Sequence, residues 1–153
     1  MLSATPGAMN LQRDRGPNQR MDLRIASDPA EARRVQDQIE QLLKDFHFGE
    51  REIFGIKLAL EEALVNAIKH GNQMDRAKKV QISCQVSHDR FDIHISDEGP
   101  GFDPGDVPDP TCVENLERPC GRGLWLMRHY MNEVAFSERG NTVRMSKVLR
   151  NGQ

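Results

Sequence analysis

Two neighbouring segments alternate between apolar and polar residues, which is the pattern of half-buried β-strands and not of helices. KVQISCQV covers residues 79–86 and RFDIHISD covers residues 90–97. Only Ser87, His88 and Asp89 separate the two segments, so the spacing predicts an antiparallel hairpin. Any fold for this chain must therefore contain an antiparallel sheet.

Helical spacing of apolar residues appears before and after this hairpin. Ser27-Asp28-Pro29 predicts a helix cap followed by proline in the first turn, and this helix runs to about His47. A second helix is expected from about Glu50 to His70, and Gly71 is placed to end it. A third is expected over residues 121–132.

Short alternating segments at both ends complete the pattern. Residues 21–26 predict a first strand, and residues 134–137 and 141–149 predict a closing hairpin. The order βααββαββ favours an α+β fold, a two-layer sandwich of a mostly antiparallel sheet with its helices on one face. Residues 1–20 lack periodic apolar positions and predict a disordered tail, so residues 21–149 form the single expected domain.

Composition excludes several classes of protein. The net charge of -2 disfavours direct nucleic-acid binding. No apolar run reaches the roughly 18 residues of a membrane helix, and the N-terminal residues have no apolar core of a secretory signal. Cys84, Cys112 and Cys120 form no C-x-x-C pair, which disfavours a disulfide framework or a zinc site and favours the cytoplasm.

The second helix carries two polar residues beside its apolar stripe. Glu62 and Asn66 are four positions apart and therefore share one helix face. An Asn amide oxygen is a ligand suited to Mg²⁺, and a nearby carboxylate can accept a hydroxyl proton. On these two residues alone, a simple solvated helix face is the favoured interpretation.

Two glycine-rich segments follow. Asp97-Glu98-Gly99-Pro100-Gly101 ends an apolar strand, where a carboxylate can accept a hydrogen bond from an exocyclic amine and glycines allow a close backbone approach. Gly121-Arg122-Gly123-Leu124 opens the third helix, where unpaired backbone N–H groups attract anions. An ordinary acidic turn and a ligand-free helix entry are the alternatives.

Together the three clusters resemble the ATP-binding fold shared by gyrase, Hsp90, histidine kinases and MutL, the GHKL or Bergerat-fold superfamily. The resemblance covers about residues 21–149. Within that superfamily the chain looks like the anti-sigma factor serine/threonine kinases of bacterial partner-switching systems. EEALVNAIKHGN, DEGPGFDP, GRGLWLMRHYMNEV and GNTVRMSK carry the resemblance.

The resemblance implies a role for each site residue. Asn66 would ligate Mg²⁺ on the phosphates of ATP, and Glu62 would be the general base toward a Ser or Thr hydroxyl. Asp97 would accept the adenine amine, with Thr142 as a second contact through ordered water. The backbone positions of the two glycine-rich segments would surround the nucleotide: Gly99 and Gly101 beside adenine, and Gly121, Arg122, Gly123 and Leu124 at the phosphates. Arg118 or Arg122 would reach the γ-phosphate, with solubility of the loop as the alternative.

The function that the resemblance implies has two parts. The protein would sequester a sigma factor, and with ATP and Mg²⁺ it would phosphorylate an anti-anti-sigma antagonist. Dimerisation is typical of the resembling family. The alternative is a non-catalytic ATP-binding anti-sigma or regulatory module, which the proline-rich segment after Gly101 favours and the intact Glu62 disfavours.

Overall fold

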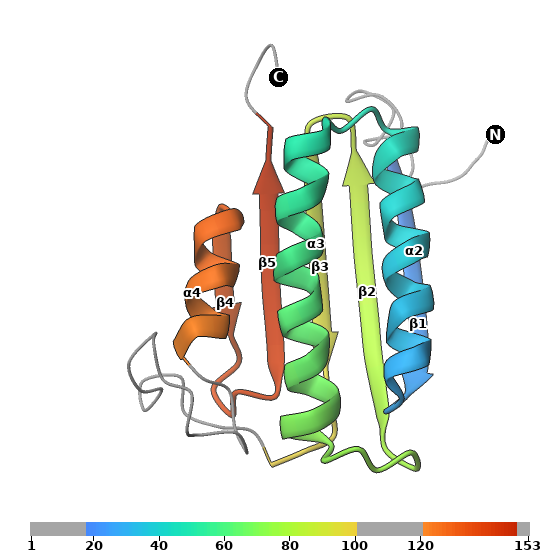
Figure 1. Ribbon diagram of the computed structural model, residues 1–153, viewed down its shortest axis with the longest axis vertical. Helices are drawn as coiled ribbons and strands as arrows, with labels where there is room; N and C mark the ends of the chain where they lie inside the picture. The colour runs from blue at the N-terminus through green and yellow to red at the C-terminus, as the bar shows by residue number, and fades with distance from the viewer. Residues whose placement is uncertain (1–17, 101–120, 150–153) are drawn as a thin grey trace, which may run out of the picture.

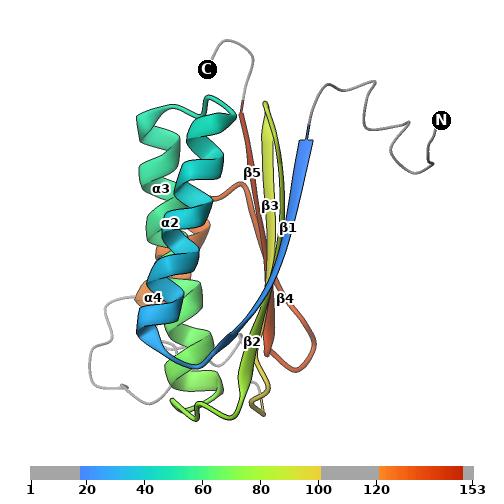
Figure 2. The same cartoon turned by 90° about the vertical axis from the view of Figure 1, so that its right-hand side faces the viewer.

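The computed structural model describes residues 18–100 and 121–149 as one antiparallel sheet covered on one face by helices (Figure 1). Figure 2 shows the helices together on one side of the sheet and the other side left open. The strands are β1 (Asn18–Ala26), β2 (Lys79–Ser87), β3 (Arg90–Ser96), β4 (Glu133–Phe136) and β5 (Thr142–Val148). The helices are α2 (Pro29–Asp45), α3 (Glu50–Val65), the π-helix η1 (Asn66–Gly71) and α4 (Gly121–Tyr130).

The sheet has five strands in the order β1-β2-β3-β5-β4, and every neighbouring pair is antiparallel. The predicted α+β sandwich and its element order are confirmed. The first strand begins at Asn18, because residues 18–20 pair with residues 85–87 of β2. These three residues therefore belong to the sheet and not to the predicted tail, whose remaining residues lie outside the described part.

Alternation along the strands separates the two faces of the sheet. The residues that point toward the helices are buried, as in the row formed by Cys84, Ile93 and Met145 on β2, β3 and β5. Leu43 from α2 and Leu60 from α3 are also fully buried in the same core. Burial of this apolar surface is the main force that holds the helices on the sheet.

The start of α2 is fixed as the sequence predicts. Asp28 is the N-cap, and its side chain accepts a 2.9 Å hydrogen bond from the backbone N–H of Ala30. Pro29 occupies the first turn, where its missing N–H costs nothing.

Helices α3 and α4 approach each other closely because of a glycine. A Cβ atom at Gly55 would lie 2.7 Å from Cδ1 of Tyr130, so any larger residue would separate the two helices. The contact brings α4 alongside the half of the molecule where α3 carries its polar residues.

The predicted second helix changes its hydrogen-bond period near its end. From Asn66 to Gly71 the chain forms η1, and the N–H of Asn72 donates to the carbonyl of Ala67 at 2.8 Å. Such π-turns are rare and occur frequently at functional sites. In the described residues, no helix has both the length and the apolar character needed to cross a membrane.

Replacement of Leu43 by Ala should destabilise the fold by about 2–5 kcal/mol, because the side chain is fully buried and its loss leaves a cavity. Urea denaturation measures the free energy of unfolding. Gln38→Ala, at an exposed position of the same helix, is the control and should change it by less than about 0.5 kcal/mol. A loss below about 1 kcal/mol for Leu43→Ala would contradict the described core.

Candidate functional site

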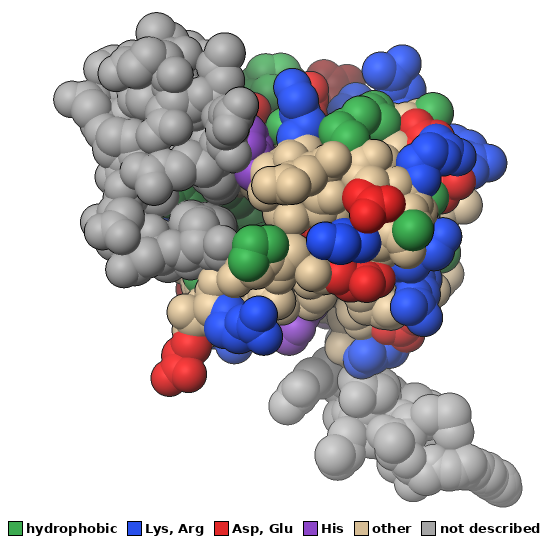
Figure 3. All heavy atoms as spheres, turned by 90° about the horizontal axis from the view of Figure 1, so that it is seen from below, with side chains coloured by type: hydrophobic (Ala, Val, Ile, Leu, Met, Phe, Trp, Pro, Cys, Tyr) green, Lys and Arg blue, Asp and Glu red, His purple; other side chains and the backbone are tan. Residues whose placement is uncertain are grey.

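The polar residues predicted to act together lie at one end of the molecule. The end of α3 and η1, the turn after β3 and the beginning of α4 meet at the lower end in Figure 1. Figure 3 looks onto this end and shows basic and acidic side chains interspersed over its described surface, without a broad region of one sign in view.

Glu62 faces the first turn of α4. A Cβ atom at Gly123 would lie 2.8 Å from Oε1 of Glu62, so glycine at this position leaves room for the carboxylate. The backbone N–H groups of a helix's first turn lack partners within the helix and carry partial positive charge. The carboxylate of Glu62 therefore lies beside an electropositive helix end, where an anion is favoured.

Asn66 is the first residue of η1 and lies one turn beyond Glu62. Its Nδ2 atom is buried and has no hydrogen-bond partner among the described residues. An orphaned buried amide is costly, by about 1–3 kcal/mol, and such groups call for an explanation. A half-turn about the terminal torsion exchanges its nitrogen and oxygen, so the same position can present a hard oxygen ligand.

This donor set fits Mg²⁺ carried by a nucleotide. Mg²⁺ is commonly bound through one or two protein oxygens, while phosphates and water complete its shell. In the described residues no three His, Cys, Asp or Glu side chains are grouped as a metal-binding cluster. Asn66 is the residue that would hold the ion.

Asp97 follows β3 and is half-buried. Its Oδ1 accepts a 2.8 Å hydrogen bond from the N–H of Gly99, and its own N–H donates to the carbonyl of Asn141 at 2.9 Å. Burial raises the pKa of the Asp97 carboxyl to about 6, although the Gly99 hydrogen bond and the charge of Lys78 act in the opposite direction. A carboxylate held in this way is short of hydrogen-bond donors and is suited to accept one from a ligand.

Glycines at two positions let the end of η1 press against the turn after β3. A Cβ atom at Gly71 would lie 2.6 Å from Oδ1 of Asp97. A Cβ atom at Gly99 would overlap the backbone carbonyl of Gly71. The predicted approach of Gly99 to a ligand stays a prediction, and the structure adds a close contact between Gly99 and the backbone of η1.

Thr142 lies at the start of β5, beside the strand end that precedes this turn. It pairs with Ser96 across β5 and β3, and the two hydroxyl oxygens are 2.9 Å apart. Since Ser96 precedes Asp97, Thr142 lies at the same end of the sheet as the residue that carries the carboxylate.

The second glycine-rich segment is described only in part. Gly121 and Arg122 begin α4, and Gly123 and Leu124 are buried in its first turn. The Leu124 side chain packs in the hydrophobic core, so its predicted contribution to the site is restricted to its backbone. Gly101 and Arg118 lie outside the described residues.

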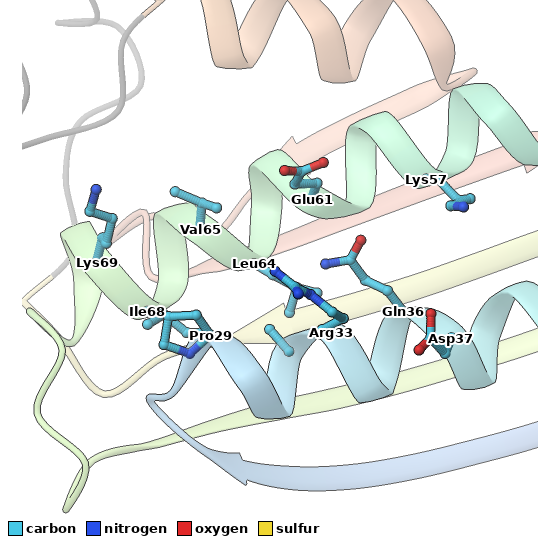
Figure 4. Close-up of a pocket in the computed structure, with 11 residues that line it drawn as sticks. Pro29, Arg33, Gln36, Asp37, Lys57, Glu61, Leu64, Val65, Ile68 and Lys69 are labelled. Carbon is cyan, nitrogen blue, oxygen red and sulfur yellow. The ribbon is translucent and has the colours of Figure 1, made fainter.

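Glu61, the neighbour of Glu62, faces a different surface. It lines a groove of about 320 Å³ between α2 and α3, together with Arg33 and Lys57 among others (Figure 4). None of Glu62, Asn66 or Asp97 lines this groove. The two adjacent glutamates are thus separated by the helix, and only Glu62 lies against α4.

Two residues of the site were not predicted to belong to it. Gly71 was expected only to end a helix, yet it forms the wall behind Asp97. Asn72 is fully buried and joins the segments around Asp97 by hydrogen bonds. The H-G-N sequence at the end of the predicted helix could have indicated these roles. A polar residue such as Asn72, buried where a helix ends, must form hydrogen bonds with neighbouring segments.

The chain matches the family of histidine kinase-like ATPase domains over residues 25–147. It is similar to the serine-protein kinase RsbW of Bacillus subtilis, with 36% identity over 110 residues that make up 67% of this chain and 68% of that protein. The anti-sigma F factor of Oceanobacillus iheyensis is 35% identical over 104 residues, 64% of this chain and 70% of that protein. The matched segments thus span about two thirds of both relatives.

A solved structure has the same fold. The crystal structure of the RsbU and RsbW domains of Rv1364c from Mycobacterium tuberculosis matches with a TM-score of 0.60 and 16% identity. The match covers 88% of this chain and 33% of that longer chain. The predicted Bergerat-type sandwich is confirmed.

The raised pKa of Asp97 predicts a stability that depends on pH. An unfolded Asp ionises near pH 4, while the folded carboxyl ionises near pH 6, so stability falls as the pH rises through this interval. Asp97→Asn keeps the acceptor for the Gly99 N–H and removes the charge. The variant should be more stable than the parent at pH 7, by about 1–3 kcal/mol, and this difference should vanish below about pH 4.

Urea denaturation at a series of pH values measures this difference. Asp89→Asn, in the turn at the opposite end of β3, is the control and should show no such gain. A variant of Asp97 that is less stable than the parent at pH 7 would contradict the assigned environment.

Proposed function

Because the chain belongs to the histidine kinase-like ATPase domain family, we propose that it is an anti-sigma factor with ATP-dependent serine/threonine kinase activity. It sequesters a sigma factor and phosphorylates an anti-anti-sigma antagonist. The names of its relatives, a serine-protein kinase and an anti-sigma F factor, support both halves of this proposal. Such partners act in the cytoplasm, which is the proposed compartment, and dimerisation remains a prediction.

The observation that carries the proposal is the buried Nδ2 atom of Asn66, which has no hydrogen-bond partner among the described residues. It lies one helical turn from Glu62, whose carboxylate faces the beginning of α4. A metal ligand, a carboxylate and a helix N-terminus are the groups that phosphoryl transfer requires for positioning and charge stabilisation. Their convergence supports a phosphotransfer site over a plain nucleotide-binding site.

The adenine side of the site is formed by the turn after β3. The Asp97 carboxylate accepts a hydrogen bond from the exocyclic amine, and Thr142 supports the same amine through an ordered water. The contact between Gly99 and Gly71 sets the depth of this turn. Gly101, outside the described residues, is proposed to continue the adenine wall.

The phosphate side is formed by α3 and α4. Asn66 would hold the magnesium ion, and the backbone N–H groups of Gly121, Arg122, Gly123 and Leu124 would bind phosphate oxygens at the helix N-terminus. When bound, Mg-ATP supplies the transferable phosphoryl group and the cation that offsets its charge. The guanidinium group of Arg118 or Arg122 is proposed to bind the γ-phosphate.

Glu62 is proposed as the general base. It accepts the proton of the Ser or Thr hydroxyl on the antagonist as that oxygen attacks. The transferred phosphate then adds about two negative charges to the antagonist. That charge at the interface stops the antagonist from displacing the sigma factor.

Replacement of Glu62 by Gln should lower phosphotransfer to the antagonist by about 10²–10⁴-fold, because the base is lost while size and shape are kept. The assay uses γ-labelled ATP, Mg²⁺ and lysate of the source cell, and it detects a small protein labelled on Ser or Thr. Glu61→Gln is the matched control, since Glu61 lines the groove on the other side of α3, and it should retain activity.

Two outcomes of this assay would count against the kinase. Labelling that survives in Glu62→Gln would show that Glu62 is not the general base. No labelling by the parent protein, with ATP binding intact, would favour the non-catalytic ATP-binding module.

Asp97→Asn should weaken ATP binding at pH 7 by at least about tenfold, because a neutral acceptor replaces a charge-assisted one. Since the pKa of Asp97 is about 6, the affinity of the parent for ATP should rise between pH 5 and pH 7, while that of the variant stays flat. Isothermal titration calorimetry measures both. Asp89→Asn should bind as the parent does, and an Asp97→Asn protein with parental affinity would refute the adenine contact.

A further inference from the structure

The side chain of Asn72 is fully buried and uses both of its polar atoms. Nδ2 donates to the hydroxyl of Ser27 at 2.8 Å and to the backbone carbonyl of Lys79 at 3.0 Å. Oδ1 accepts from the backbone N–H of Glu98 at 2.8 Å. One carboxamide thereby joins three segments that are distant in the sequence.

Each of these residues lies at or beside the end of a strand. Ser27 connects β1 to α2, Lys79 begins β2, and Glu98 lies in the turn that follows β3. A second layer of bonds closes the junction: the Ser27 hydroxyl donates to the carbonyl of Lys78 at 2.6 Å, and the N–H of Lys79 donates to Oε2 of Glu98 at 2.8 Å. The turn after β3 is therefore held from two sides.

Asn72 also fixes this turn relative to the helix that carries Asn66. Its backbone N–H donates to the carbonyl of Ala67 within η1, and it directly follows Gly71, which forms the wall behind Asp97. Glu98 donates its backbone N–H to the Asn72 side chain and is the direct neighbour of Asp97 in the chain. A shift of the Asn72 side chain would thus move the Asp97 carboxylate away from its place against η1.

We propose that Asn72 is a positioning residue that holds Asp97 at the adenine amine and so sets the preference of the site for adenine over guanine. This inference rests on the proposed function, in which the site binds ATP. Adenine presents an amine donor where guanine presents a carbonyl oxygen, which a carboxylate repels. Such discrimination needs the carboxylate fixed within hydrogen-bond distance, and a loose carboxylate would accept either base.

A buried asparagine can also serve stability alone, because any buried polar group needs partners. The test must therefore measure selectivity as well as stability. Asn132 offers a control at an exposed position: its Oδ1 also accepts a backbone N–H, that of Val148 at 2.7 Å, at the opposite end of the sheet. Asn132→Ala removes a similar bond far from Asp97.

The first measurement is the affinity for Mg-ATP and for Mg-GTP, at a temperature where circular dichroism shows every variant folded. Asn72→Ala should weaken ATP binding about tenfold and leave GTP binding nearly unchanged, so the GTP-to-ATP ratio of Kd falls about tenfold. Ser27→Ala, which deletes one hydroxyl of the same junction, should lower the ratio about threefold. Asn132→Ala should leave it unchanged.

The second measurement needs no nucleotide. The ¹³C shift of the Asp97 carboxyl, followed against pH, should give a midpoint near 6 in the parent protein. In Asn72→Ala the midpoint should fall toward the ordinary value of about 4, because a loosened turn admits water to the carboxyl. Ser27→Ala should move it in the same direction by less, and Asn132→Ala should not move it.

The results separate the two claims. A parental protein that binds neither nucleotide would refute the proposed function, and the carboxyl titration would then decide the positioning role alone. A parental protein that binds ATP and GTP equally would overturn the inference about selectivity. An unchanged ratio and an unchanged midpoint in both Asn72→Ala and Ser27→Ala, with lowered melting temperatures, would reduce Asn72 to a stabilising residue.

Discussion

The arrangement of the site depends on one backbone contact, where the end of η1 lies directly against the turn after β3. Gly71 and Gly99 allow this contact, since a Cβ atom on either would occupy the space of the other segment. The contact removes water from one side of Asp97, and this loss of solvation is the main cause of its raised pKa. Without the two glycines, the helix that carries Glu62 and Asn66 would lie farther from the sheet end that carries Asp97.

Polar residues beside the buried stripe of α3 are explained by the site and not by the core. The buried stripe of α3 covers the sheet, while Glu62 lies toward α4 and Asn66 begins η1. The orphaned amide of Asn66 and the half-buried carboxylate of Asp97 both reduce stability in the free protein. Functional sites commonly keep such unfavourable groups because a ligand satisfies them.

Much of this fold could be predicted from the sequence, because local patterns specify it. Alternation along residues 79–97 predicts the hairpin, and Asp28 and Pro29 predict the start of α2. Residues 18–20, which extend β1 beyond its predicted start, show no such pattern because Asn18, Gln19 and Arg20 are all polar. They belong to an edge strand, which needs only backbone hydrogen bonds to β2. The roles of Gly71 and Asn72 also escaped prediction, because they depend on contacts with segments distant in the chain.

The π-helix gives the site a particular sensitivity to chain length. The N–H of Asn72 bonds to the carbonyl of Ala67, five residues earlier, whereas an α-helix would use the carbonyl four residues earlier. The segment therefore holds one extra residue. The backbone, and not the identity of the side chains, sets the angle about the helix axis between Asn66 and Asn72. Loss or gain of a single residue here would rotate one asparagine about the helix axis relative to the other. The length of this segment is therefore as much a part of the site as the side chains of Asn66 and Asn72.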